Sequence, residues 1–135
     1  MRFMFATAAA AALLFGHTAL AQEIQAPEGY QAVSSLVELP DFLPGMGSLY
    51  VKPETLPAGP FLAYDRDGKL VSTTYMVPIE DSQAQKPFDN LTVGAGNVVE
   101  TQLYYNAGHP GVETPHYHVV LWHVPPAEAK LDAAQ

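Results

Sequence analysis

The sequence predicts a β-rich α+β domain, either a single antiparallel sheet or a small open barrel, built from hairpins and followed by a short C-terminal helix. Three observations support this fold class. Runs of β-branched and aromatic residues alternate with clusters of Gly, Pro, Asn and Asp, which favour turns. Two of these runs flank an Asp67-Gly68 pair, which is a strong hairpin signal. A stretch of good helix formers follows Pro125-Pro126.

Residues 1–21 have the features of a signal peptide. Met1-Arg2 is basic, Phe3–Phe15 is apolar and rich in Ala, and Ala19-Leu20-Ala21 fits the small-x-small pattern that precedes a cleavage site. The apolar run is shorter than the about 20 residues that a spanning helix needs. We therefore expect cleavage before Gln22 and a mature protein that is periplasmic or secreted, with no membrane insertion.

The mature chain is expected to have a lead-in, residues 22–44, and one β-rich domain, residues 45–135. Within this domain Met46–Val51 is a predicted short strand. Phe61–Tyr64 and Leu70–Val77 are the predicted arms of a hairpin.

The turn of this hairpin, Asp65-Arg66-Asp67-Gly68, also has the Asp-x-Asp start of a calcium loop. Lys69 occupies the next ligand position, and no acidic residue closes the loop. A hairpin turn is therefore the better interpretation of these four residues.

A second hairpin is predicted near the C-terminus. Its strands are Val98–Tyr105 and Pro115–Val124, and Asn106–Thr114 is a wide connecting loop. A single helical turn is expected at Asp81–Gln85, and a short helix over Ala127–Ala134.

Composition limits the classes of partner. The chain has no Cys, and 14 Asp and Glu against 6 Lys and Arg give a net charge of −8, or −9 once Arg2 leaves with the signal peptide. This negative field repels phosphate backbones and anionic lipid, so nucleic acid is not an expected partner. A homo-oligomer or a protein partner in the cell envelope stays open. Because no disulfide can form, packing, a metal ion or oligomerisation must stabilise the domain.

Four of the five histidines lie in the window His109–His123. Imidazole is the commonest metal ligand in proteins. If Pro115–Val124 is a strand, His116 and His118 point to the same face, because alternate residues of a strand share a face. Their Cα atoms are then about 7 Å apart, which lets both imidazoles bind one ion from one side.

A metal site needs a further ligand. His109 supplies it if the connecting loop folds back. Glu100 or Gln102 supplies it if the hairpin register places them opposite the histidine pair. The expected cofactor is a divalent ion, namely Zn, Cu, Ni or Mn. The predicted metal ligands are His109, His116, His118 and Glu100.

A structural role is the alternative for each histidine. A His-x-His pair occurs by chance, and histidines on strands often bond only to their neighbours. His109 lies in a Gly-His-Pro-Gly turn, where its side chain could bond the backbone alone. His123 shares the presumed core face with Leu121, where a buried neutral imidazole is expected.

The cupin pattern offers a further comparison, because these β-barrels bind metal through a Gly followed by His-x-His. Here Gly111 precedes His116-Tyr117-His118, but no Glu follows at the expected short spacing and no second half-motif exists. A small cupin-like, metal-dependent enzyme is therefore an alternative. It would need an enclosed pocket and an open coordination position beside the histidine pair.

Several motifs between Gly45 and Pro125 together resemble a known family. They are Gly45-Met46-Gly47, the hairpin from Gly59 to Pro78, and Tyr105–Gly111 followed by Pro115-His116-Tyr117. The family consists of small exported bacterial proteins of largely unassigned function. It is typified by a Thermus protein linked to an extracytoplasmic sigma factor and its anti-sigma factor.

The resemblance implies a compact β-rich or α+β domain that assembles into a homo-oligomer, with no established reaction. This chain has His118 where the family pattern has Asp, and Val120 where the pattern has His. The resemblance therefore carries ligand roles to His109 and His116 alone.

The leading hypothesis is an exported, non-catalytic binding or regulatory protein whose histidine cluster binds a divalent metal or a small ligand. The alternatives are the cupin-like enzyme and a structural or interaction module without a ligand. Geometry discriminates between them, because His116 and His118 must either line a concave cavity or be packed against other side chains.

Overall fold

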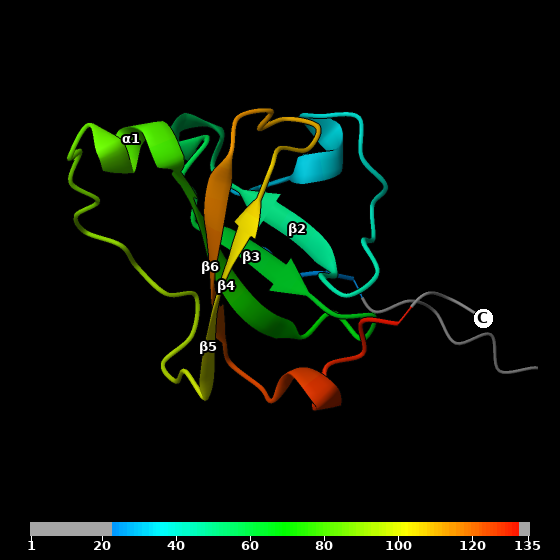
Figure 1. Cartoon of the computed structure of the whole chain (residues 1–135). Helices are drawn as coiled ribbons and strands as arrows, with labels where there is room; N and C mark the ends of the chain where they lie inside the picture. The colour runs from blue at the N-terminus through cyan, green and yellow to red at the C-terminus, as the bar shows by residue number, and fades with distance from the viewer. Residues whose placement is uncertain (1–22, 133–135) are drawn as a thin grey trace, which may run out of the picture.

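The computed structural model describes residues 23–132. The expected signal peptide, residues 1–21, lies outside this range. The described chain forms one open antiparallel sheet of six strands in the order β1-β2-β3-β4-β6-β5 (Figure 1). The predicted fold class is confirmed, and of its two expected forms the structure has the single sheet.

The six strands are short at the N-terminal edge and longer toward the C-terminal edge. They are β1 (Gln31–Ala32), β2 (Ser48–Val51), β3 (Phe61–Tyr64), β4 (Leu70–Pro78), β5 (Glu100–Asn106) and β6 (His116–Trp122). Helical structure in the described range is limited to short turns. They are the 3-10 turns Val33–Ser35, Pro53–Thr55 and Pro126–Glu128 and the α-helix α1 (Ile79–Gln83).

The first predicted hairpin is confirmed, because β3 and β4 pair on either side of the Asp65–Gly68 turn. One carboxylate oxygen of Asp65 accepts hydrogen bonds from the backbone N–H groups of Asp67 (2.9 Å) and Lys69 (3.0 Å). The carboxylate thus closes the turn, and Gly68 provides the positive φ of 74° that the turn needs.

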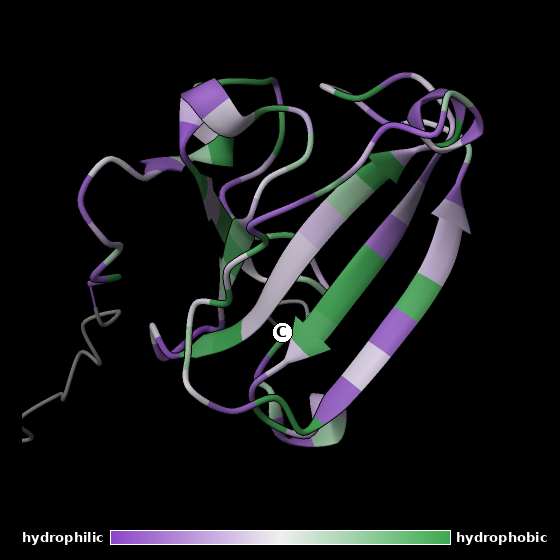
Figure 2. Ribbon diagram, turned by 90° about the vertical axis from the view of Figure 1, so that its left-hand side faces the viewer, coloured by the Kyte–Doolittle hydropathy of each residue, from purple (hydrophilic) through white to green (hydrophobic). Residues whose placement is uncertain are grey.

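The second predicted hairpin is confirmed as well. β5 and β6 pair over seven residues, and β6 also pairs with β4 over seven residues. As a result, β6 lies between two long partners. Figure 2 shows that hydrophobic residues are concentrated on β6 and are sparse on the edge strand β5.

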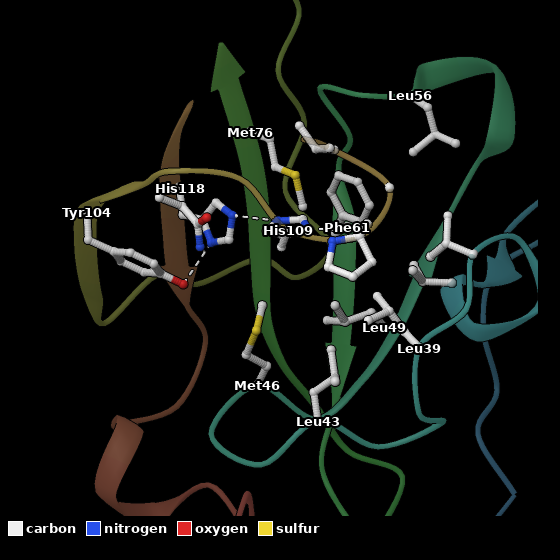
Figure 3. A pocket seen from close by; sticks show the side chains of 16 residues that line it. Leu39, Leu43, Met46, Leu49, Leu56, Phe61, Met76, Tyr104, His109 and His118 are labelled. Carbon is white, nitrogen blue, oxygen red and sulfur yellow. Dashed lines mark hydrogen bonds between the residues drawn. The ribbon is translucent and has the colours of Figure 1, made fainter. Parts of the chain in front are cut away.

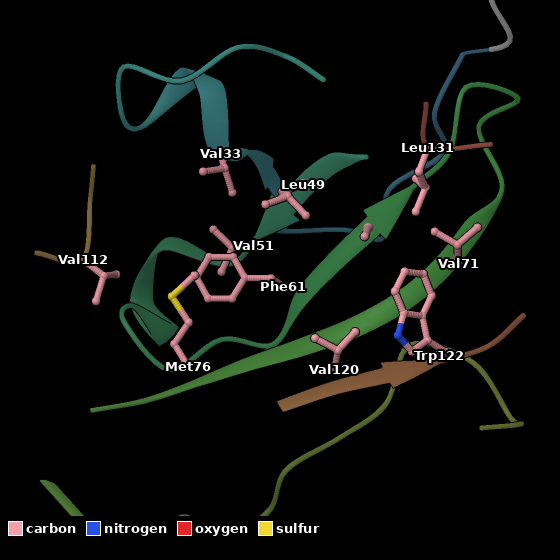
Figure 4. Packing of buried hydrophobic residues seen from close by; sticks show 11 residues of the cluster. Val33, Leu49, Val51, Phe61, Val71, Met76, Val112, Val120, Trp122 and Leu131 are labelled. Carbon is pink, nitrogen blue, oxygen red and sulfur yellow. The ribbon is translucent and has the colours of Figure 1, made fainter. Parts of the chain in front are cut away.

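The core lies on one face of this sheet (Figure 4). The inner row of β6 runs through His116, His118, Val120 and Trp122, all of which are buried. Val120 and Trp122 pack in the apolar core. The side chains of His116 and His118 therefore point to the same face of the sheet as these core residues and not to solvent.

Segments outside the long strands complete the core. The expected lead-in, residues 22–44, contributes β1 and the buried Val33. The short C-terminal helix is a single 3-10 turn, Pro126–Glu128, after which Ala129 is extended. This extension places Leu131 in the core at 6% exposure. Burial of Leu131 outweighs the helix propensity of the surrounding alanines.

His123 is buried, as expected, but the face assigned to it was wrong. Val120 and Trp122 pack in the apolar core, so His123 and Leu121 lie on the opposite, outer face of the sheet. Its Nδ1–H donates to the carbonyl oxygen of Asn97 at 2.5 Å, and its Nε2 accepts from the Thr73 hydroxyl at 2.7 Å. The Thr73 oxygen in turn accepts from the N–H of Gly94 at 2.8 Å. Both ring nitrogens are thus used, and His123 ties the segment around residues 94–97 to the outer face of the sheet.

Candidate metal centre

Three histidine side chains converge on one point at the end of β6. The Nε2 atoms of His116 and His118 are 2.9 Å apart, those of His116 and His109 are 3.2 Å apart, and those of His109 and His118 are 3.3 Å apart. His109, His116 and His118 also form a group whose geometry could hold a metal ion. We call these three residues the histidine triad.

Strand alternation and pairing position two members of the triad. His116 lies opposite Pro78 of β4 and Asn106 of β5, and His118 lies opposite Met76 and Tyr104. Both side chains therefore point to the inner face, as the His-x-His spacing predicts. His116 is 0% exposed and His118 is 2% exposed.

A tight turn brings His109 to the other two. The N–H of Val112 donates to the carbonyl oxygen of His109 at 3.0 Å, with Pro110 and Gly111 at the centre of the turn. Gly111 has a φ of +90°, and Pro followed by Gly at positive φ is typical of a type II turn. Val112 is buried in the core and anchors the turn, so the loop folds back as the third-ligand hypothesis requires.

The other nitrogen of each triad ring has its own hydrogen-bond partner. Nδ1 of His116 lies 2.7 Å from the carbonyl oxygen of Thr114, and Nδ1 of His109 lies 3.0 Å from that of Pro110. A carbonyl oxygen can only accept, so both Nδ1 atoms carry the proton. In the neutral rings the two Nε2 atoms then present lone pairs to the centre of the triad.

Nδ1 of His118 pairs with the hydroxyl of Tyr104 at 2.8 Å. Sequence reasoning missed Tyr104 as a site residue. Tyr104 shares a face of β5 with Glu100 and Gln102, the residues that were expected opposite the histidine pair. It lies two residues beyond Gln102 and is the residue that pairs with His118. The length of the loop decides this register, and the strand boundaries expected from the sequence do not fix it to within two residues.

Glu100, the fourth predicted ligand, is not part of the triad. It lies opposite Trp122, at the far end of the β5–β6 pair. Its Oε1 accepts from the side-chain amide of Gln102 at 3.2 Å, and the Gln102 amide oxygen accepts from the Trp122 indole N–H at 3.0 Å. Gln102 therefore contacts the core residue Trp122, and the exposed Glu100 contacts Gln102 and not the metal centre.

Burial and the two neighbouring histidines favour the neutral form of His118. Desolvation lowers its pKa from 6.5 to about 4, and the neighbouring His116 and His109 act in the same direction. An unprotonated imidazole is the form that binds metal. The site thus keeps the lone pair of His118 available at neutral pH.

A cavity adjoins the triad. It has a volume of about 280 Å³ and is lined on one side by His109, His118 and Tyr104 (Figure 3). His116 is fully buried and is not among the residues that line it. Two of the three rings therefore border a concave space, and the third is packed against protein.

Comparison with solved structures shows a similarity to a Thermus protein. The crystal structure of the hypothetical protein TTHB210 from Thermus thermophilus matches this chain with 36% sequence identity and a TM-score of 0.61. The match covers 72% of this chain and 91% of the Thermus chain. No protein-family model and no curated protein matches this sequence.

The lowered pKa of His118 predicts a pH dependence of stability in the metal-free protein. The unfolded chain takes up the proton near pH 6.5, whereas the folded chain resists it until about pH 4. The contribution of this group to the free energy of unfolding is therefore fully present above pH 6.5 and is lost as the pH falls to about 4. Urea unfolding with EDTA across this range, from neutral pH down to the folded pKa, measures it.

The variant His118→Gln is the comparison, because Gln keeps a polar side chain but does not titrate. We expect a shallower loss of stability in this variant between pH 6.5 and about 4 than in the wild type. Equal slopes for the two proteins would contradict the assigned environment of His118.

Proposed function

The chain belongs to the family of the hypothetical protein TTHB210 from Thermus thermophilus, and we propose that it is an exported, non-catalytic binding or regulatory protein whose histidine triad holds one divalent metal ion. The observation that carries this proposal is the convergence of three Nε2 atoms, 2.9–3.3 Å apart, on rings whose Nδ1 atoms are already hydrogen-bonded.

The dimensions of the triad suit a tetrahedral ion. Zinc–nitrogen bonds of about 2.0–2.1 Å at tetrahedral angles place ligand nitrogens about 3.3 Å apart. The triad distances lie at or slightly below this value. Metal-binding histidines generally donate their second N–H to a carbonyl oxygen, a carboxylate or water, and His109 and His116 show this arrangement.

The chemistry of the ligands narrows the choice of metal. Imidazole nitrogens suit Zn, Cu and Ni, whereas Mn prefers oxygen ligands. Because Glu100 does not join the triad, no carboxylate oxygen of the described residues is within the cluster. We therefore rank Zn and Cu first, then Ni, and place Mn last.

Export, the regulatory role and an envelope partner rest on the sequence. The signal-peptide features of residues 1–21 support a periplasmic or secreted location. Within residues 23–132, no helix has the length and apolar character to cross a membrane. The link of the family to an extracytoplasmic sigma factor and its anti-sigma factor, implied by the resemblance, is part of the same proposal.

The two alternatives differ in what supports them. Cupins are two-sheet β-barrels, whereas this chain forms a single open sheet. The cavity beside His109 and His118 does provide the concave space that an enzyme would need. A purely structural role fits His123, whose ring nitrogens are both paired with other groups. It fits the triad less well, because there the nitrogens face one another.

A homo-oligomer is the second part of the proposal, and the sheet edge supports it. β5 has β6 on one side and no strand of the described range on the other. Next to this edge, Leu103 (65% exposed), Tyr105 (56%) and Tyr117 (39%) lie on the outer face. An open edge beside exposed apolar side chains favours association. We call the open edge of β5 and these three side chains the β5 surface, and we propose that a second copy of the chain covers it.

Metal binding predicts a gain in thermal stability. An ion that binds only the folded chain stabilises it by about 2.7 kcal/mol at a hundredfold excess over Kd. For a domain of this size the melting temperature should rise by roughly 10 °C. Thermal melts of EDTA-treated protein with added Zn, Cu, Ni or Mn measure the shift, which we expect to be largest for Zn and Cu.

Two sets of variants make the result specific. His109→Ala and the double change His116→Ala with His118→Ala should abolish the shift. His123→Ala should lower the melting temperature of the metal-free protein but keep the shift, because His123 lies outside the triad. The absence of a shift in the wild type, or an equal shift in the double variant, would show that the triad does not bind metal.

The oligomer proposal predicts a mass above that of one chain by light scattering of purified mature protein. Leu103→Lys should lower this mass by placing a charge on the β5 surface. Leu91→Lys is the matched control, since Leu91 is also exposed (50%) but lies outside β5. A monomeric wild type, or equal dissociation by both changes, would contradict the proposed interface.

A further inference from the structure

The cavity beside the histidine triad is polar at one end and apolar elsewhere. His109, His118, Tyr104 and Asn106 provide its polar groups. Its other walls are largely apolar and include Leu39, Leu43, Leu49, Phe61, Met76 and Val112. Figure 3 shows His118 between Tyr104 and His109, with Leu39, Leu43 and Leu49 toward the opposite end. A ligand that fits this space needs a polar head and an apolar tail.

The polar head of such a ligand would bind at the free coordination position of an ion held by the triad. Three histidines occupy three positions of a tetrahedral ion, and the fourth stays open in sites that take a ligand. Tyr104 does not fill it, because its hydroxyl is bonded to Nδ1 of His118, on the far side of the ring from Nε2. The open space beside two of the three rings is the cavity.

Charge then selects an anionic head. Three neutral imidazoles leave the 2+ charge of the ion uncompensated. The side chains that line the cavity, all within residues 23–132, include no Asp, Glu, Lys or Arg. In surroundings of low polarity an uncompensated charge attracts an anion strongly. An anionic ligand atom would therefore be held more firmly than water or an alcohol.

We propose that the cavity binds a small aliphatic monocarboxylate, with its carboxylate on the triad-bound metal and its alkyl chain against the apolar walls. This inference rests on the proposed metal site and names the class of ligand that the site takes. The volume of about 280 Å³ lies just below the roughly 300–1,000 Å³ typical of small-molecule pockets. The cavity thus suits a short or medium chain.

Calorimetric titration of the zinc-loaded protein with acetate, butanoate, hexanoate and octanoate tests the proposal. Each buried methylene should lower Kd by about fourfold, which corresponds to about 0.8 kcal/mol. The gain should stop once the chain exceeds the cavity. 1-Hexanol should bind more weakly than hexanoate by about tenfold or more, because it lacks the charge that the ion attracts. Metal-free protein should lose most of its affinity for hexanoate.

A cavity-filling variant gives a second measurement. Leu43 lies on the apolar wall, so Leu43→Phe should reduce the affinity for hexanoate toward that for acetate while zinc binding is unchanged. Leu91→Phe, at an exposed position that does not line the cavity, should leave both affinities as in the wild type.

The outcomes separate this inference from the metal proposal. If zinc binds but Kd is independent of chain length, or hexanol binds as well as hexanoate, the carboxylate inference is wrong and the metal site stands. If zinc does not bind the wild type, both proposals fail. Zinc binding with a chain-length dependence that Leu43→Phe abolishes supports both.

Discussion

The site depends on one hydrogen-bonding constraint. Nδ1 of His109 and Nδ1 of His116 face carbonyl oxygens, which can only accept, so the neutral rings must direct unprotonated Nε2 atoms toward the same point. A proton on the Nε2 of one ring would provide a hydrogen bond for a single pair of nitrogens. The lowered pKa of His118 opposes such a proton on that ring. A divalent cation at the centre satisfies all three nitrogens at once.

The fold holds the rings in this arrangement from two directions. β6 is hydrogen-bonded on both sides over seven residues, which fixes His116 and His118 relative to each other. The turn that carries His109 is anchored in the core by Val112. His123, on the same segment of chain, shows the opposite outcome, because Thr73 and Asn97 pair with both of its nitrogens. Histidines close in sequence thus have different roles, set by the face on which they lie.

The sequence predicted those parts of the structure that depend on local pattern. Strand alternation placed His116 and His118 on one face, and turn chemistry located the Asp65–Gly68 hairpin. The register of β5 against β6 was not predictable from the sequence, so Gln102 and Glu100, which lie two and four residues before Tyr104, were considered as partners of the histidine pair. The cavity could not be predicted either, since Leu39 and Leu43 come from an irregular segment. Such a segment has no periodicity to show which side chains will meet the triad.

The central claim is that three imidazoles bind one metal ion, and X-ray absorption at the zinc edge tests it most directly. The EDTA-treated protein, loaded with one equivalent of zinc, should show three imidazole nitrogens at about 2.0–2.1 Å. The imidazole signal should fall in His109→Ala, which removes the ligand carried by the turn. A shell made only of oxygen atoms, as expected for zinc on surface carboxylates, or a spectrum unchanged in His109→Ala, would contradict the account.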